Sequence, residues 1–437
     1  MASNGAGLLN VAIIGAGPAG YYAAEALTGG DGNVHVDIID RLPTPFGLIR
    51  AGVAPDHQSI KNVSRRYEAT NSRENVRFVG NLALGRDITL AELRELYDAV
   101  VLATGAGKDR PLGIEGEDLS GVIGSAAFVG WYNAHPDYKD LNPDLRVASV
   151  AVIGNGNVAV DVARVLAKTA SEMTSSDLAA HAASTIHGSP IRDIYILGRR
   201  GPLEASFTPK ELGELNQLEN CVALVKPEQL PDRAADESLT GAAKKNMATL
   251  RAIAANSPDA KPVRLHLQFY RRPMAIMGET CVCGIRLEET KVEDGKCVGT
   301  GMTEVLPVGL VVPCIGYRTS PIRDVPYSER YGCFENEGGR ILDRLYCVGW
   351  ARRGPTGTIG TNKPDGLEVA NKILSEVKAS GREGRDGLDR IVRERDLHIV
   401  TFQSWKKIEA SEEAGAQAGA PRKKLVDVAE MVRIAES

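Results

Sequence analysis

The chain carries the same order of apolar and polar positions twice: an apolar run, a glycine-rich turn and then a helix-like stretch of small residues. The first copy begins near residue 11 and the second near residue 149. A short apolar run that ends at glycine is typical of a buried strand, and small residues after it suit a helix packed close to the sheet. The repetition predicts an α/β protein with two Rossmann-like, three-layer dinucleotide-binding domains.

The turn of the first copy places Gly15, Gly17 and Gly20 in the spacing GxGxxG. Gly15 permits a tight turn, Gly17 lets the backbone approach a pyrophosphate, and Gly20 allows the helix to pack close to the strand. The pyrophosphate then lies at the positive end of that helix. The next apolar run ends in Asp40, which is placed to accept hydrogen bonds from ribose hydroxyls. The alternative is a surface carboxylate at a strand end, but the glycine spacing favours the nucleotide site.

The turn of the second copy contains Gly154 and Gly156, and its next apolar run ends in Arg199 and Arg200 instead of an acid. Two guanidinium groups suit a 2′-phosphate, whereas a carboxylate would repel it. This domain is therefore predicted to bind NADP, the alternative being a solvated charge pair. The long spacing between the glycines and the arginines indicates an insertion, which a helical stretch at 169–187 accounts for.

Two further apolar runs that end at glycine, Ala99 to Gly105 and Leu310 to Gly316, are interpreted as the crossings between the domains. The NADP domain is then inserted into a discontinuous FAD domain. The expected parts are the first part of the FAD-binding domain at 1–107, the NADP-binding domain at 108–320, and the second part of the FAD-binding domain with a C-terminal tail at 321–437.

In the last part, the apolar run from Leu345 ends at Trp350, where a flavin ring can lie. The segment from Arg352 to Ile359 is rich enough in glycine to bring backbone N–H groups against the flavin or the phosphates. Three other segments show no obvious chemistry: a polar helix-and-loop stretch at 233–262, a loop at 410–422 and a final amphipathic segment at 425–435.

Composition excludes several classes of protein. The 437 residues, 43% hydrophobic and 25% charged, suit a globular protein of two or three domains. No run of 18 apolar residues and no cleavable leader is found, so we expect a cytoplasmic protein without membrane insertion. A net charge of −4 argues against nucleic acid as a partner. Of seven cysteines, the closest pair is Cys281 and Cys283, so reduced, mostly buried thiols are expected, with no metal site and no redox dithiol.

Longer distinctive strings occur at Pro45 to His57, Val129 to Asn133, Gly198 to Leu203, Phe207 to Leu212 and Arg353 to Gly357. Together they resemble the adrenodoxin reductase family of ferredoxin–NADP reductases, which are glutathione reductase-type flavoproteins. The resemblance runs from about residue 11 to the final helix. It implies two Rossmann-like domains with bound FAD, and transfer of a hydride from NADPH to FAD followed by single electrons to a ferredoxin or ferredoxin-like iron–sulfur protein.

The resemblance also implies roles for single residues. For FAD these are Gly15, Gly17, Ala19, Gly20, Asp40, Leu48, Leu82, Trp350, Gly357, Thr358 and Ile359. For NADP they are Asn155, Gly156, Asn157, Val158, Arg199, Arg200, Glu211 and Gly357. His57 and Glu214 are the candidates to tune proton movement or the position of the nicotinamide. The alternatives are a structural hydrogen bond for His57 and a solvated helix position for Glu214.

The resemblance implies less about the surface that docks an iron–sulfur protein. Basic residues that can contribute to it, or serve as ordinary surface charge, are Arg41, Arg50, Arg65, Arg66 and Lys210. The vertebrate enzymes have arginine where this chain has Gly213, so their docking face is not expected intact. The chain also begins without an Arg-rich presequence, which favours a bacterial cytoplasmic member.

Other functions keep part of this pattern. A disulfide reductase of the thioredoxin reductase type needs a Cys-x-x-Cys beside the flavin, and the sequence has none. An NADPH-dependent flavin monooxygenase, or the NADPH-entry subunit of a larger redox enzyme, would keep both glycine turns. A nucleotide-binding sensor without enzymatic activity belongs to a different class.

Overall fold

The computed structural model describes residues 7–30 and 33–437, so the expectation about a presequence lies outside the described residues at the start of the chain. The described part folds into two compact units. Unit 1 comprises Met1–Lys108, Asn133–Pro136 and Tyr317–Ser437, and unit 2 comprises Asp109–Tyr132 and Asp137–Gly316. Unit 2 is thus inserted into a discontinuous unit 1, and both are α/β structures, which confirms the predicted fold class.

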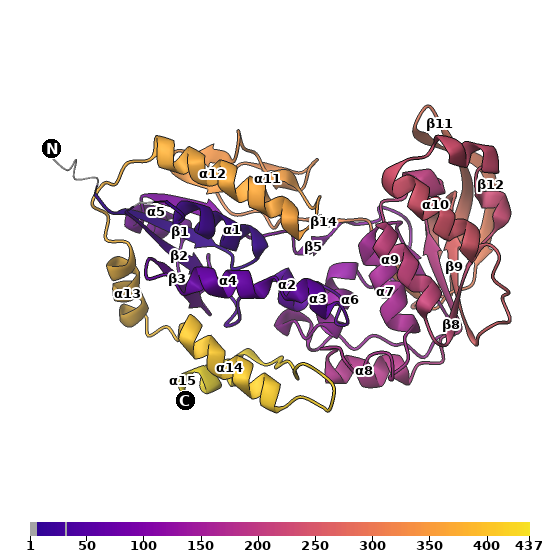
Figure 1. Ribbon diagram of the computed structural model, residues 1–437, viewed down its shortest axis with the longest axis horizontal. Helices are drawn as coiled ribbons and strands as arrows, with labels where there is room; N and C mark the ends of the chain where they lie inside the picture. Colours follow the sequence, from indigo (N-terminus) through magenta and orange to yellow (C-terminus); the bar gives the residue numbers. More distant parts are fainter. Residues whose placement is uncertain (1–6, 31–32) are drawn as a thin grey trace. The chain divides into compact units, whose positions relative to one another are not determined.

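Unit 1 is built on a sheet in the order β17-β18-β4-β1-β2-β3-β19 (Figure 1). The strands from β18 to β3 run parallel, and the edge strands β17 and β19 are antiparallel to their neighbours. Runs such as Val11 to Ile14 are apolar on both faces, as a parallel sheet covered on both sides requires. The strand bounds are β1 Leu9–Ile14, β2 Val34–Ile39, β3 Val76–Gly80, β4 Ala99–Leu102, β17 Arg340–Leu342, β18 Leu345–Cys347 and β19 Val400–Thr401.

Helices cover both faces of this sheet. On one face, α1, α4, α12, α14 and α15 contribute to a core with Val11, Ile13 and Val36, and on the other α5 and α13 pack on Ala12, Ile14 and Val100. The helix bounds are α1 Pro18–Leu27, α2 Leu48–Ala51, α3 Gln58–Lys61, α4 Ser64–Asn71, α5 Leu90–Leu96, α11 Trp350–Arg353, α12 Asn362–Glu376, α13 Arg385–Glu394, α14 Phe402–Ala414 and α15 Val428–Glu436. The short strands are β14 Tyr317–Arg318, β15 Tyr327–Ser328 and β16 Cys333–Phe334.

Unit 2 contains a parallel sheet in the order β13-β6-β7-β9-β8 and an antiparallel sheet in the order β10-β11-β12. The strand bounds are β6 Ser149–Ile153, β7 Asp193–Leu197, β8 Cys221–Val225, β9 Val263–Gln268, β10 Arg271–Met277, β11 Gly284–Glu293, β12 Lys296–Leu306 and β13 Leu310–Pro313; β5, Lys108–Asp109, lies where the chain leaves unit 1. The helices are α6 Ser125–Tyr132, α7 Asn157–Ala167, α8 Ala180–His187, α9 Pro209–Glu214 and α10 Gly241–Ile253.

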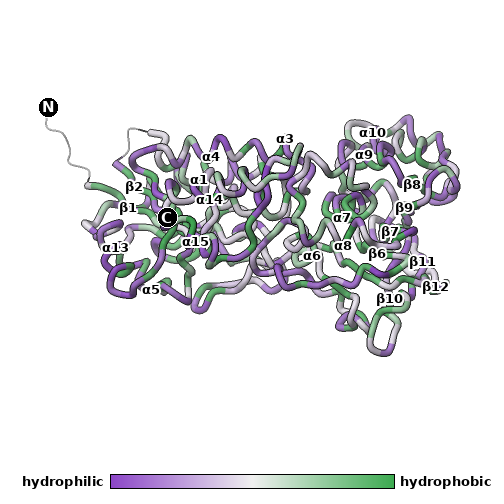
Figure 2. The backbone as a smooth tube through the Cα atoms, turned by 90° about the horizontal axis from the view of Figure 1, so that it is seen from below, coloured by the Kyte–Doolittle hydropathy of each residue, from purple (hydrophilic) through white to green (hydrophobic). Residues whose placement is uncertain are grey.

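The antiparallel sheet of unit 2 covers one face of the parallel sheet, where Ile276, Ile285 and Leu287 form a core with Ala151 and Ile153. Buried apolar residues of α7 belong to the same unit, and the tube in Figure 2 is mostly green around this helix. Unit 2 therefore also has layers on its parallel sheet, as the doubled pattern predicts.

Three segment-level expectations need correction. The stretch 169–187 is helical only in α8, and its first part forms turns in which the Ser176 hydroxyl donates to the carbonyl of Met173. The expected loop at 410–422 begins later, since α14 continues to Ala414. All seven cysteines lie in the described part and none forms a disulfide there, but only Cys221, Cys333 and Cys347 are buried, so the expectation of mostly buried thiols is wrong.

None of the helices in the described part of the chain is both long and apolar enough to span a lipid bilayer.

Candidate functional site

The glycines of the first turn have different surroundings. A Cβ at Gly15, where φ is +118°, would lie 2.3 Å from the carbonyl oxygen of Ala103. A Cβ at Gly20 would lie 2.1 Å from the carbonyl oxygen of Gly15. At Gly17, the N-cap of α1, a Cβ would meet no heavy atom within 4 Å. Gly15 and Gly20 are thus required by the fold, whereas Gly17 leaves its backbone open to a ligand at the helix N-terminus, as a bound pyrophosphate requires.

Asp40 follows β2 and stands beside this turn. Its Oδ2 accepts the backbone N–H of Ala16 at 2.8 Å, and its Oδ1 accepts that of Leu42 at 2.9 Å. Burial raises the pKa of this carboxyl above its ordinary value, against the lowering effect of these two bonds. The backbone N–H of Leu82 donates to the carbonyl of Asp40 at 2.9 Å, and the Leu82 side chain is buried in the core. The turn and the predicted ribose acceptor therefore form one hydrogen-bonded unit.

A strained loop presses against the same turn. Phe46 has φ of +81°, and its N–H donates to the carbonyl of Ala16 at 2.8 Å. A Cβ at Gly47 would lie 2.9 Å from the Cα of Gly17. Leu48 then begins α2 and is 42% exposed, so its side chain is accessible to a ligand.

The segment after β18 approaches α1 closely. A Cβ at Gly349 would lie 2.4 Å from the Cβ of Ala19, and the indole N–H of Trp350 donates to the carbonyl of Thr356 at 3.1 Å. Beyond it, Gly357 has φ of +83°, and Thr358 caps the turn Ile359–Thr361 that leads into α12. The predicted flavin residues Trp350 and 357–359 thus belong to one hydrogen-bonded loop.

Asp365 holds this loop and was missed by the sequence reasoning. Its Oδ2 accepts the N–H of Gly349 at 2.5 Å, and its carboxylate pairs with Arg352 and Arg353 at 2.6 Å each. The available signal was an acid on a helix that directly follows the glycine-rich segment, next to Gly366.

The second turn, in unit 2, repeats the first. A Cβ at Gly154, where φ is +136°, would lie 2.4 Å from the carbonyl oxygen of Cys314, and Gly156 is the N-cap of α7. The side chain of Asn155 lies over Gly198, and Asn157 Oδ1 accepts the N–H of Thr208 at 2.8 Å. Together with Val158, which is partly buried in the first turn of α7, these residues leave backbone N–H groups at a helix N-terminus.

Arg199 and Arg200 follow β7 and are both exposed. Their backbones are fixed, since the carbonyl of Arg199 accepts from the Thr290 hydroxyl at 2.8 Å and that of Arg200 accepts from the N–H of Tyr270 at 3.1 Å. Within the part of the chain that the structure describes, no carboxylate pairs with either guanidinium. A fixed backbone with two unpaired cations suits an anion such as a 2′-phosphate.

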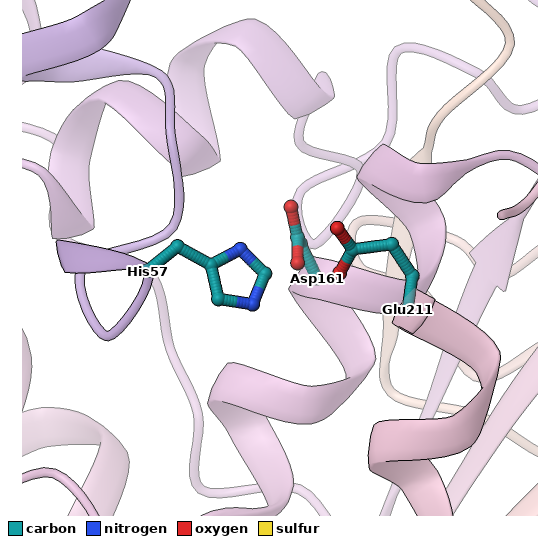
Figure 3. Close-up of side chains that lie close together, drawn as sticks. All are labelled: His57, Asp161 and Glu211. Carbon is teal, nitrogen blue, oxygen red and sulfur yellow. The ribbon is translucent and has the colours of Figure 1, made fainter. Parts of the chain in front are cut away.

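Unit 2 also contains a charged cluster on α7 and α9. The Arg164 side chain is fully buried and pairs with Asp161 at 2.8 Å and with Glu214 at 3.3 Å. Carboxylate oxygens of Asp161 and Glu211 lie within 4.8 Å of each other, and the two side chains project from facing helices (Figure 3). Glu214 is thus an ion-paired residue and not a solvated helix position. The sequence reasoning missed Arg164, because a single arginine in an apolar helix gives no sign of its partner.

The remaining candidates are a histidine, several basic residues and Gly213. His57, also labelled in Figure 3, is buried at the N-cap of α3 in unit 1. Arg41, Arg65 and Lys210 are exposed, and Arg66 pairs with Glu25 at 2.6 Å. Arg50 is partly buried and pairs with the buried carboxylate of Glu412, so it is not an ordinary exposed surface charge. A Cβ at Gly213 would meet no heavy atom within 4 Å, so the backbone here has room for the first atom of a side chain.

Comparison with known proteins adds independent evidence. A mitochondrial NADPH:adrenodoxin oxidoreductase from Arabidopsis thaliana is 40% identical, and the match covers 96% of this chain and 93% of the relative. The NADPH-ferredoxin reductase FprA of Mycobacterium leprae is also 40% identical, over 97% of this chain and 98% of the relative. The chain belongs to this adrenodoxin reductase and FprA family.

Solved structures agree with membership of this family. The structure of Mycobacterium tuberculosis FprA in complex with NADPH matches with a TM-score of 0.94 at 38% identity, covering 99% of this chain and 100% of that one. The model of pyridine nucleotide-disulphide oxidoreductases matches residues 9–196. The predicted family is therefore confirmed.

Proposed function

We propose that this protein is an FAD-dependent ferredoxin–NADP(+) reductase, which takes electrons from NADPH and passes them to a ferredoxin or ferredoxin-like iron–sulfur protein. The observation that carries the proposal is the 40% identity with two such reductases over nearly the whole chain. The two glycine turns, one beside a carboxylate and one beside two unpaired arginines, supply the matching chemistry.

In unit 1, we propose that the first turn holds the FAD pyrophosphate. The open Gly17 and the N-terminus of α1 fit a pyrophosphate, while Gly15, Ala19 and Gly20 shape the turn. Asp40 keeps lone pairs beyond its two backbone bonds, and these can accept from the ribose. The other proposed contacts are Leu48, Leu82, Trp350, Gly357, Thr358 and Ile359. FAD, when bound, supplies a hydride acceptor that releases its electrons singly.

In unit 2, we propose that Asn155, Gly156, Asn157 and Val158 bind the pyrophosphate of NADPH through backbone N–H groups at the start of α7. Arg199 and Arg200 then bind its 2′-phosphate, which distinguishes NADPH from NADH. Glu211 and Gly357 complete the proposed NADP contacts.

His57 and Glu214 remain proposals for proton movement or nicotinamide position. The ion pair between Glu214 and Arg164 favours a positioning role for the acid, because a paired carboxylate is a poor proton carrier. His57→Ala should then change the pH profile of kcat more than Glu214→Gln does.

The experiment that tests the function is anaerobic reduction. The purified protein should be yellow, NADPH should bleach the flavin, and a ferredoxin from the same cells should restore the colour. Oxygen consumption with substrate hydroxylation would instead indicate a monooxygenase, and a permanent partner on purification would indicate an entry subunit. A flavin that NADPH cannot reduce would indicate a sensor and refute the proposal.

We also propose that the protein acts in the cytoplasm, since the sequence carries no run of 18 apolar residues. Cell fractionation followed by immunoblotting tests this, and recovery in the membrane fraction would count against it.

A further inference from the structure

The C-terminal segment contacts the loop that presses on the first glycine turn, and the contact is made by a buried ion pair. The carboxylate of Glu412, on α14, is fully buried and receives two hydrogen bonds from the Arg50 guanidinium, one of them 2.8 Å long. It also accepts the backbone N–H of Leu425 at 2.8 Å. Because this buried carboxylate accepts hydrogen bonds from both Arg50 and Leu425, it holds the segments that contain these two residues in place.

Arg50 is held from several sides at once. Its carbonyl accepts from Lys424 Nζ at 2.8 Å, and its guanidinium lies 5.3 Å from the centre of the Trp405 ring. Trp405 in turn packs edge-on against Phe46 at 6.4 Å. The segment from Trp405 to Leu425 therefore contacts this loop in three ways. It binds the carbonyl and the guanidinium of Arg50, and it packs against the ring of Phe46.

The loop in question touches the proposed flavin site. Phe46 holds a positive φ and bonds to Ala16, and Gly47 approaches the Cα of Gly17 so closely that no side chain fits between them. A strained backbone of this kind persists only where its surroundings fix it. Glu412 and Trp405 supply those surroundings from a part of the sequence more than 350 residues away.

We infer that Glu412 is a positioning residue for FAD: by fixing Arg50 it holds residues 46–51 against the Gly17 turn in the conformation that receives the pyrophosphate. This inference rests on the proposed function, because it concerns the affinity of the FAD site. It assigns a binding role to a residue of the C-terminal tail that has no contact with the glycine turn itself.

The test compares FAD affinity in the full-length protein. Glu412→Gln removes the charge but keeps the shape, and the dissociation constant for FAD should rise roughly 10- to 100-fold, the value of about one charge-assisted hydrogen bond. FAD is removed and titrated back while flavin fluorescence is followed. The matched control is Glu409→Gln on the same helix, whose carboxylate pairs with Lys406 and Arg422. It should change the constant less than about twofold.

A purely structural role predicts a different result. Glu412→Gln would then lower the thermal midpoint of the FAD-free and FAD-loaded proteins equally and leave the dissociation constant unchanged, which would overturn the inference. If Glu412→Gln is not recovered folded, the same FAD titration is made with Arg50→Lys. This variant keeps the positive charge but loses the two-pronged contact with Glu412, so its dissociation constant for FAD should also rise. If the unaltered protein binds no FAD, the proposed function fails, and this outcome is distinct from an unaffected variant.

Discussion

At the scale of single residues, the glycines of the first turn have two different roles: some are required by the fold, and one is required by the proposed ligand. Gly15 and Gly20 each have a carbonyl oxygen within 2.3 Å of where a Cβ would stand, whereas Gly17 has open space. A substitution at Gly20 should therefore disrupt the fold, whereas a substitution at Gly17 should disrupt only the binding of FAD.

We expect Gly17→Val to fold and to be isolated largely without flavin. Its circular dichroism should match that of wild-type protein stripped of FAD, because the new side chain meets nothing within 4 Å of its Cβ. Gly20→Ala serves as the contrasting variant and should give little folded protein, since its Cβ would collide with Gly15. A fully flavinylated Gly17→Val protein would contradict the assignment of this turn.

The two arginines after β7 allow a second prediction. Charge-assisted hydrogen bonds are worth roughly 1.5 to 3 kcal/mol each, so replacing both Arg199 and Arg200 by alanine should lower kcat/KM for NADPH by about 10²- to 10⁴-fold. Activity with NADH should barely fall, and the flavin spectrum should stay unchanged. Steady-state kinetics with both nucleotides checks this. A double variant that still prefers NADPH as strongly as wild type would mean that these are ordinary surface charges.

Sequence reasoning at this scale works for residues whose role is local. Gly15, Gly17 and Asp40 are recognisable because a fixed spacing brings them to one turn. Arg164, Asp365 and Glu412 are not recognisable, because their roles depend on partners brought close only by folding. Arg50 shows the limit best: in the sequence it is one basic residue among several, and its buried partner lies 362 positions away.

At the scale of elements, a residue that caps one helix can also form an ion pair with another helix. Thr89 and Glu92 form a capping box at the start of α5, and Arg395, at the end of α13, also pairs with Glu92. The hydrogen bond from Arg395, followed by those from Thr89, lowers the pKa of Glu92 to about 2 from its ordinary value of 4.5. The charged form of this residue therefore stabilises the folded state.

The sign of its pH dependence follows from the lowered pKa. The stabilisation is fully present above about pH 4.5 and is lost as the pH falls towards 2. Glu92→Gln keeps a side chain that can complete the capping box but loses the charged pair with Arg395, so it should lower the thermal midpoint at pH 7 by an amount that corresponds to less than about 1 kcal/mol for a solvent-screened pair, and the difference from wild type should shrink below pH 4.5. Glu95→Gln, an exposed acid on the same helix, is the control. A difference that stays constant down to pH 2.5 would exclude this role.

The elements themselves were largely predictable. The strands around both glycine turns follow from apolar runs that end at glycine, and a parallel sheet makes such runs unambiguous. The stretch 169–179 was not, since its alanine and serine content suits a helix, whereas in the structure it forms turns in which the Ser176 hydroxyl donates to the carbonyl of Met173. The antiparallel strands β11 and β12 show no such apolar run in the sequence. In β12, for example, most residues are exposed and many are polar.

At the scale of the whole molecule, the chain must exchange electrons with another protein. Charged faces attract over roughly 10 Å at 0.1 M ionic strength and roughly 3 Å at 1 M. Reduction of a ferredoxin should therefore weaken with added salt, whereas reduction of a small artificial acceptor should change much less. Rates measured for both acceptors across a salt series check this, and equal sensitivity would speak against docking by charge.

The insertion of unit 2 into unit 1 has a consequence for how the protein is made. Strand β18 pairs with β4 in the FAD sheet, but it leaves the ribosome about 240 residues after β4. At about 5–20 residues per second, this leaves the N-terminal half-sheet without its neighbour for roughly 10 to 50 s. Unit 2 ends at Gly316, only about 30 residues before β18, so for most of this interval the nascent chain carries an incomplete unit 2 together with a unit 1 sheet that lacks β18. A premature stop between residues 316 and 345 therefore yields a chain with all of unit 2 but a unit 1 sheet that lacks β18 and the proposed flavin loop after it.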